Sequence, residues 1–230
     1  MNPPFYCAQF EGDKMKLSEM FTKEIGYINN TVLQQITINT LDSSPKCIKT
    51  IPASSTGKYH PTYSLGEGGL VRHIKAAVGV AHGLIETDIF KNIALGNHNT
   101  ISENELQCFK DCAYVALILH DCCKALDSDN KHHTQFEHPV FAAKQFRNNV
   151  KLYLSENKIS NLDLEILKKY VPYIYKAIAS HMGQWNTKKN SKTVLPEPEN
   201  GLENFVHLCD YLASRKYLIF DFSIYNEVER

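Results

Sequence analysis

The sequence has little of what a membrane-spanning, secreted or nucleic-acid-coating protein needs. Its 230 residues contain no apolar run that approaches the roughly 18 needed to cross a bilayer. Lysine plus arginine and aspartate plus glutamate both number 25, so no global field attracts polyanions. The first residues lack the charged-then-apolar pattern of a signal peptide. We therefore expect a cytoplasmic protein without membrane contact.

The cysteines exclude two further classes of protein. Seven is an odd number, and no C-x-x-C pair is present. A disulfide framework and a thiolate zinc site are therefore not expected. Free thiols in a reducing compartment explain the cysteines better.

Strand-like alternation of apolar and polar residues is also missing, as are internal repeats, whereas helical spacing recurs along most of the chain. The sequence therefore predicts an all-α fold. We divide it into an N-terminal helical extension (1–50), a main domain (51–220) and a C-terminal tail (221–230), with a homodimer formed through the N-terminal helices as one option. Helices are expected from Leu70 to about 85, over about 103–121, from Pro139 onward, over 162–180 as two helices jointed at Pro172, and over about 201–218.

Side chains that can bind a metal ion lie on or beside the apolar faces of these helices. Burial of ionisable groups is costly unless they are paired or coordinated. One such histidine is more often a satisfied core residue than a ligand, but six ligand-type residues from five separate elements favour a shared cation. These residues are His73, His120, Asp121, His138, His181 and Asp210.

The order of the motifs "GGLVRH", "HDCCK", "EHPVFAA", "ASHMGQW" and "HLCDYLASR" resembles the HD-domain superfamily of metal-dependent phosphohydrolases. The similarity runs from about residue 51 to 217 and implies an HD-domain helical bundle. Within the superfamily the sequence is most similar to stand-alone proteins related to bacterial 3′-5′ exoribonucleases. The GYP motif of cyclic di-GMP phosphodiesterases is absent.

The resemblance also implies which residues hold metal. His73, His120 and both aspartates would hold one divalent ion, and His138 and His181 a second, with the Asp121 carboxylate bridging the two. Imidazole and carboxylate ligands suit several metals. We expect manganese or iron first, with zinc, nickel or magnesium as further candidates.

Lys124 follows Asp121 by three residues and matches a position where the family often has a phosphate-facing lysine. Together with Asp121 it is our candidate catalytic residue, and a solvated lysine at a helix end is the alternative. His132 and His133 are either additional site residues or exposed loop histidines.

The segment 51–70 is rich in Pro, Ser, Thr and Gly and has the composition of a loop, but it lacks the spacing of a Walker phosphate loop. We expect it to pack over the mouth of the site, with Lys58 and His60 as substrate contacts. Trp185, the only tryptophan, either stacks on a nucleobase or packs against the helix that precedes it.

These features predict a phosphohydrolase or phosphodiesterase that acts on a nucleotide or short oligonucleotide. The substrate is expected to be a small phosphate-bearing molecule, because no extended nucleic-acid groove is evident. Residues 1–50 are too short and too helical to form the OB domain of the exoribonucleases, so processive RNA decay is not expected. Two alternatives stay open: a di-iron oxygenase of the same fold that cleaves C–C or C–P bonds, and a non-catalytic nucleotide-sensing module.

Overall fold

A computed structural model describes residues 15–54, 56–94, 101–126, 134–189 and 191–223. Within these residues the regular elements are helices, together with one isolated antiparallel bridge between Thr187 and Val194. The prediction of an all-α bundle is confirmed. The elements, in chain order, are η1 (Ser18–Phe21), α1 (Thr22–Ile25), α2 (Thr31–Asp42), η2 (Lys46–Lys49), η3 (Thr62–Ser64), α3 (Gly69–Leu84), α4 (Asp88–Ala94), α5 (Glu103–Leu119), α6 (His138–Glu156), α7 (Asn161–Ser180), η4 (Gly183–Trp185) and α8 (Gly201–Ala213).

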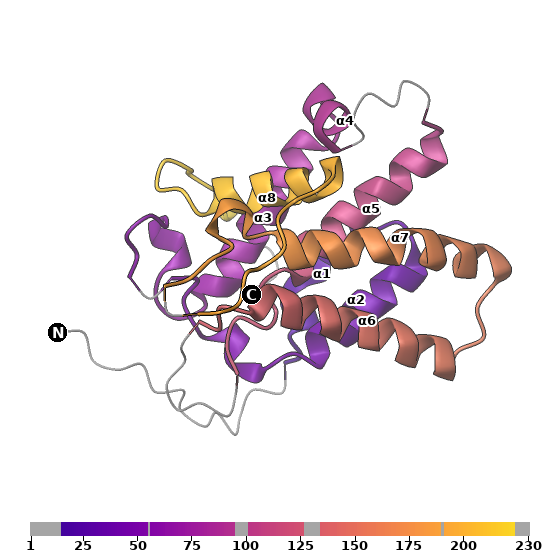
Figure 1. Cartoon of the computed structure of the whole chain (residues 1–230), viewed down its shortest axis with the longest axis horizontal. Helices are drawn as coiled ribbons and strands as arrows, with labels where there is room; N and C mark the ends of the chain where they lie inside the picture. Colours follow the sequence, from indigo (N-terminus) through magenta and orange to yellow (C-terminus); the bar gives the residue numbers. More distant parts are fainter. Residues whose placement is uncertain (1–14, 55, 95–100, 127–133, 190, 224–230) are drawn as a thin grey trace.

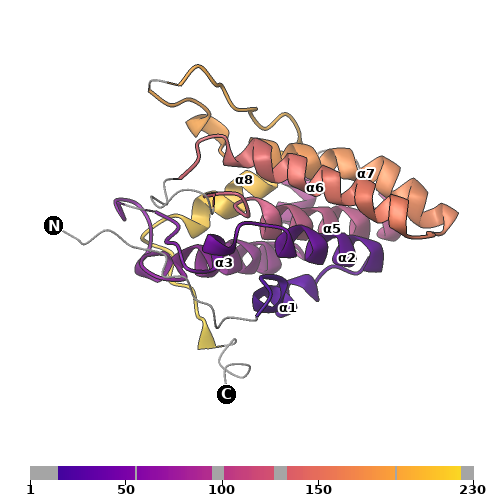
Figure 2. The ribbon, with the colours of Figure 1, turned by 90° about the horizontal axis from the view of Figure 1, so that it is seen from below.

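Helix α5 is the central helix of the bundle. Its second half is buried on every side, which is why the sequence there is apolar all round. It packs against α2, α3, α7 and α8. Figure 2 shows α5 running between α2 and α3 on one side and α7 on the other. The residues that follow the buried end of α5 are thereby placed in the middle of the molecule.

Four of the longer helices begin with the same local device. A Ser or Asn immediately precedes each helix, and its side-chain oxygen accepts a hydrogen bond from the backbone amide three residues later. This bond satisfies an amide that has no partner inside the helix. The helix starts are therefore fixed by short-range chemistry at Asn30, Ser102, Ser160 and Asn200.

The N-terminal helices pack on the rest of the bundle. Helix α2 contacts α5 and α6, and Leu33 and Ile36 are fully buried. The buried carboxylate of Asp111 on α5 accepts hydrogen bonds from the backbone amides of Asn29 and Asn30, at 3.0 and 2.9 Å. The connection between extension and main domain is therefore polar as well as apolar. The domain boundaries themselves stay a prediction.

Two of the predicted helices differ from the structure. Helix α7 runs without interruption through Pro172, because the proline lies on the exposed side while Tyr170 and Ile174 are buried against the bundle. A proline inside a helix costs about 3 kcal/mol, which burial of the opposite face offsets. Helix α8 ends at Ala213 instead of near 218, where the backbone bonds tighten: the amide of Arg215 donates to the carbonyl of Leu212, three residues back, and the hydroxyl of Ser214 donates to that of Tyr211.

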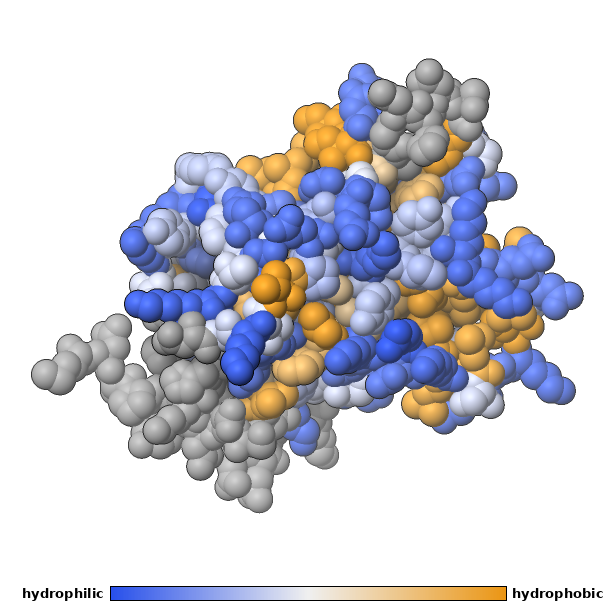
Figure 3. Space-filling view, in the orientation of Figure 1, coloured by the Kyte–Doolittle hydropathy of each residue, from blue (hydrophilic) through white to orange (hydrophobic). Residues whose placement is uncertain are grey.

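Helices α6 and α7 form an antiparallel hairpin (Figure 1). On the face shown in Figure 3, hydrophobic residues gather where the end of α6 meets the start of α7. Leu152 and Leu162, which belong to these segments, are 51% and 67% exposed. His138 begins α6 and His181 follows α7, so these two histidines lie at the other end of the hairpin. Among the described helices, none is long and apolar enough to cross a membrane.

Candidate metal centre

The six predicted ligand residues come together at the centre of the bundle. They are supplied by α3, the turn after α5, the start of α6, the end of α7 and α8. Five of them are at most 2% exposed, and the sixth, Asp210, keeps 18% of its side chain accessible. Asp210 therefore marks the side from which solvent reaches the cluster. The five enclosed residues are His73, His120, Asp121, His138 and His181.

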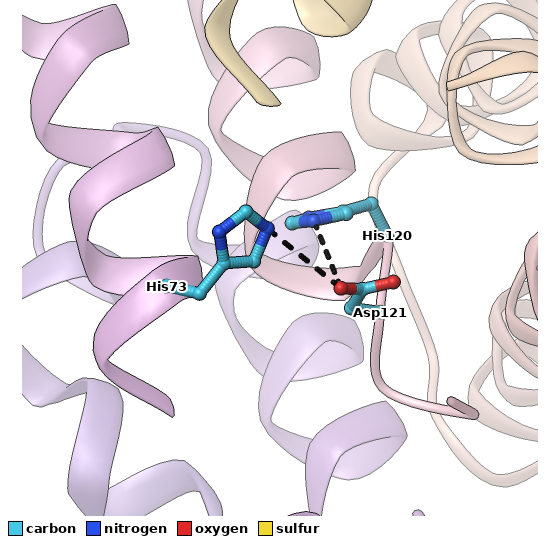
Figure 4. Close-up of side chains that lie close together, drawn as sticks. All are labelled: His73, His120 and Asp121. Carbon is cyan, nitrogen blue, oxygen red and sulfur yellow. Dashed lines mark ion pairs between the residues drawn. The ribbon is translucent and has the colours of Figure 1, made fainter. Parts of the chain in front are cut away.

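The carboxylate of Asp121 lies between two pairs of histidines. Its Oδ2 is 3.8 Å from His73 Nε2 and 3.5 Å from His120 Nε2. Its Oδ1 is 2.9 Å from His138 Nε2 and 3.7 Å from His181 Nε2. Figure 4 shows the first pair, with one carboxylate oxygen facing both rings. Each oxygen of Asp121 thus faces its own pair of imidazole nitrogens.

Asp210 supplies a second carboxylate to the first pair. Its Oδ1 is 2.9 Å from His73 Nε2 and 3.5 Å from His120 Nε2. Helices α3 and α8 pack along each other, which brings residues that are 137 positions apart into contact. His73 and His120 are therefore flanked by the carboxylates of Asp121 and Asp210.

Backbone carbonyls fix the orientation of three of the histidine rings. His120, His138 and His181 each donate their Nδ1 hydrogen to the carbonyl three residues earlier in the chain, at 2.7, 2.6 and 2.8 Å. A carbonyl can only accept a hydrogen bond, so Nδ1 carries the hydrogen in each ring. In the neutral tautomer the lone pair is then on Nε2, the atom that faces the carboxylates.

The charges in this centre are strongly coupled. Burial favours the neutral form of both aspartates, but nearby positive groups and hydrogen bonds outweigh it and hold the pKa values of Asp121 and Asp210 well below their usual range. Burial likewise opposes a charge on His120, and the two carboxylates reverse that effect and raise its pKa to about 9. The carboxylates are thus ionised at neutral pH and attract a cation.

The residues present suit one or more divalent metal ions. Three overlapping groups have ligand atoms that all lie within 4.8 Å of one another: His73, His120 and Asp121; His120, His181 and Asp210; and Asp121, His138 and His181. Nε2 of His120 and Oδ1 of Asp121 are buried and have no hydrogen-bond partner within the described residues. Buried polar atoms without partners are rare, and a coordinated ion would satisfy both.

A family model for the HD domain matches residues 79–215, more than half of the chain. The chain belongs to the HD domain family. HD domains are metal-dependent phosphohydrolases that bind divalent metal ions, and the matched segment contains all of the ligand residues except His73, which precedes it by six positions. Neither the search of curated proteins nor that of solved structures gave a significant match. The closer relation to exoribonuclease-like proteins stays a prediction.

Lys124 of this HD domain is part of the buried cluster. Its Nζ lies 2.6 Å from Oδ2 of Asp121, and only 13% of its side chain is exposed. The alternative of a solvated lysine at a helix end does not fit this environment. A cation is therefore held beside the carboxylate that faces all four histidines.

Of the two loop residues expected to contact substrate, the structure brings only His60 to the centre. The His60 ring lies 5.9 Å from that of His73, between centroids. Burial lowers the pKa of His60 to about 4, helped by the charges of His73 and Lys124. His60 is therefore neutral at physiological pH. Lys58 is exposed, and its Nζ lies 5.0 Å from the centroid of the neighbouring Tyr59 ring, turned along its own loop.

Arg72 holds this loop against the HD domain, a role that the sequence did not suggest. Its guanidinium donates to the carbonyls of Tyr63, Leu65 and Glu67. Gly69 permits the close approach, because a Cβ there would lie 2.4 Å from the carbonyl oxygen of Ser64. The only sequence signal was an arginine beside His73 at the start of an apolar helix.

Trp185 packs against α8, and not against the helix that precedes it, as the sequence had suggested. Its ring is stacked on that of Tyr211 with centroids 5.5 Å apart and planes 8° apart. The turn before it requires glycine: Gly183 has φ +54°, and a Cβ there would lie 2.3 Å from the His207 ring. His207 in turn donates from Nδ1 to the carbonyl of His181 at 2.7 Å. Trp185 is therefore fixed relative to the metal centre.

The remaining candidates, His132 and His133, lie outside the described residues.

Proposed function

We propose that the protein is a phosphohydrolase or phosphodiesterase with a binuclear metal centre, acting on a nucleotide or a short oligonucleotide. The observation that carries this proposal is the position of Asp121. Its two oxygens face different pairs of histidines, at 3.5 and 3.8 Å for one pair and 2.9 and 3.7 Å for the other. A carboxylate is the ligand type here that readily spans two ions, so this arrangement supports two metals sharing Asp121.

The two ions would have different ligand sets. His73, His120 and Asp210 would hold the first together with Oδ2 of Asp121, and His138 and His181 would hold the second together with Oδ1. When bound, such a pair of divalent ions lowers the pKa of a coordinated water and offsets the negative charge of phosphoryl oxygens. Imidazole and carboxylate donors favour manganese or iron in this proposal, with zinc, nickel and magnesium as alternatives.

Lys124 and His60 would act on the substrate directly. Lys124 is a compact cation on a flexible stem, already within 2.6 Å of Asp121, and can neutralise charge that develops on the transferred phosphoryl group. His60 is neutral near the mouth of the centre, so it can form a hydrogen bond with a substrate oxygen without adding charge. A positively charged lysine next to the centre favours a phosphate ester over an uncharged substrate.

The experiment is manganese-dependent hydrolysis of nucleoside mono- and triphosphates, cyclic nucleotides, dinucleotides and bis-p-nitrophenyl phosphate. The Asp121→Ala variant is compared with Asp221→Ala, whose carboxylate is exposed and outside the centre. We expect turnover in the wild type and in Asp221→Ala and none in Asp121→Ala. If metal-loaded protein hydrolyses no ester, the proposal is wrong. Oxygen consumption by iron-loaded protein would then indicate the oxygenase alternative, and nucleotide binding without turnover would indicate a sensor.

A further inference from the structure

Three aromatic rings from separate segments surround one arginine, and we call them the aromatic platform: Tyr59, Trp185 and Tyr211. Trp185 comes from η4 and stacks in parallel on Tyr211 of α8. Tyr59 comes from the loop that precedes α3. Segments this far apart in the chain converge here only because α8 packs against both α3 and α7.

Arg215 links the three rings. The central carbon of its guanidinium lies 4.1 Å from the ring centroid of Tyr211, 5.1 Å from that of Trp185 and 5.8 Å from that of Tyr59. A guanidinium is planar and is attracted to aromatic faces. Within the described residues Arg215 forms no ion pair with a carboxylate. Its Nε also donates to the backbone carbonyl of Tyr211 at 3.4 Å, so that this bond and the rings together set its position beside Tyr59, Trp185 and Tyr211.

Each residue of the platform lies within four positions, along the chain, of a residue at the metal centre. Tyr59 precedes His60, whose ring lies 5.9 Å from that of His73. Tyr211 follows Asp210 directly on α8. Trp185 lies four residues beyond His181, in a turn held by the hydrogen bond from His207. A ligand bound at the centre through its phosphate would therefore have aromatic surface within reach.

The platform also leaves aromatic surface open. Trp185 is 40% exposed and Tyr59 is 56% exposed, although both rings are held by defined contacts. Scattered exposed aromatic residues need no explanation, but exposed rings held in place near the proposed phosphate site match the way in which proteins stack nucleobases. Stacking of this kind accepts any base, because every base has a π-face.

We propose that Tyr59 and Trp185, supported by Tyr211, form the nucleobase subsite of this enzyme, and that Arg215 is a positioning residue that holds their rings together. The inference rests on the proposed function, in which the phosphate of the same ligand binds at the metal centre. It makes the substrate a nucleotide with a base that contributes to binding, rather than a sugar phosphate or an alkyl phosphate.

The first test uses Trp185 as its own reporter, because it is the only tryptophan in the chain. The fluorescence of manganese-loaded protein is titrated with adenosine, guanosine, cytidine and uridine 5′-monophosphates and, in parallel, with ribose 5-phosphate. All five ligands carry the same phosphate. We expect saturable quenching by the nucleotides and not by the sugar phosphate, because only a stacked base reaches the indole.

The second test compares kinetics on the best substrate and its base-free counterpart: ribose 5-phosphate for a monophosphate, or an abasic dinucleotide for a dinucleotide. Trp185→Ala and Tyr59→Ala should raise KM for the nucleotide by about 5- to 150-fold, the range typical of base stacking, while kcat stays within about threefold. KM for the base-free compound should not change. Trp185→Phe should restore most of the loss, and Arg215→Gln should raise nucleotide KM without affecting kcat.

Tyr217→Ala is the matched control, since this tyrosine is 69% exposed, lies two residues beyond Arg215 and forms no ring contact within the described residues. Equal KM values for wild type and Trp185→Ala on a nucleotide that is turned over, without quenching, overturn the inference and leave the proposed function intact. Quenching by nucleotides that Tyr59→Ala weakens, in a protein that hydrolyses no ester, supports the base site and overturns the proposed function.

Discussion

The Nε2 atoms of His138 and His181 lie 3.2 Å apart, although both rings already donate their Nδ1 hydrogen to a backbone carbonyl. In their neutral forms the two rings therefore point lone pairs at each other inside a buried site. A second proton on one ring would relieve this contact, but burial lowers the pKa of His138 and opposes that proton. Oδ1 of Asp121 lies 2.9 Å from His138 Nε2 and adds another electron-rich atom. A metal ion would satisfy all three atoms.

The first prediction concerns metal content. Replacement of His138 or His181 by Gln should remove about one of two bound ions per chain and lower activity at least ~100-fold, since even changes behind the ligands cost 10–100-fold. Elemental analysis after gel filtration measures the ratio. His82→Gln is the control, because His82 bonds Tyr114 away from the centre. Two ions retained in His138→Gln would contradict the ligand assignment.

The second prediction concerns Lys124. Lys124→Gln should lower kcat by about 10²- to 10³-fold, the usual effect of removing one group that stabilises transition-state charge, while the bound metal remains. Steady-state kinetics and metal analysis on the same preparation separate the two effects. Lys110→Gln, which loses only an ion pair with the exposed Glu86, should behave as wild type. An unchanged kcat in Lys124→Gln would show that this lysine only neutralises Asp121.

The third prediction concerns the metal-free protein. The pKa of His120 is about 9 in the folded chain, above its ordinary value of about 6.5, because Asp121 and Asp210 outweigh the effect of burial. The charged ring therefore stabilises the fold below about pH 6.5, and this contribution is lost as the pH rises to 9. The free energy of unfolding should fall by on the order of 3 kcal/mol over this window. Urea unfolding after chelation measures it.

The control for that experiment is His120→Gln, which removes the titrating ring but keeps the neighbouring groups. Its unfolding free energy should depend less on pH between 6.5 and 9 than that of the wild type. Identical slopes for the two proteins would mean that His120 is neutral in the metal-free fold.

The fourth prediction concerns the contact between the N-terminal extension and α5. Asp111→Ala should destabilise the protein by about 1 to 3 kcal/mol, because the backbone amides of Asn29 and Asn30 lose their acceptor. Gln107→Ala removes only a third donor to the same carboxylate and should cost less than about 1 kcal/mol. Chemical denaturation of both variants tests the difference. Equal stabilities would show that the extension is held by apolar packing alone.

The sequence predicted the metal-ligand residues and the helical class. The ligand residues could be chosen because ionisable groups on apolar helix faces need a shared partner. The helical class followed from periodicity. The course of α7 through Pro172 could not be predicted, since it depends on burial of the opposite face against other helices. Local propensity carries no information about that tertiary contact.

The sequence did not identify residues whose roles depend on contacts made only in the folded chain. Lys58 and His60 looked equivalent in the sequence, and only the folded loop shows that His60 turns inward and Lys58 outward. Arg72 gave no signal because its partners are backbone carbonyls, which no sequence motif reveals. The contacts of Arg215 with three rings depend on segments that meet only in the folded chain.

The hydrogen bonds from the ligand histidines to backbone carbonyls affect how this centre responds to amino-acid substitutions around it. Three imidazoles are oriented by carbonyls that belong to Leu117, Gln135 and Ile178, and every amino acid brings the same carbonyl. Many metal sites use a side-chain carboxylate for this purpose and lose it by a single substitution. Here the orientation of the rings does not depend on which side chains stand at those three positions, provided that the helix ends keep their geometry. The orientation of these three rings is set by the main chain.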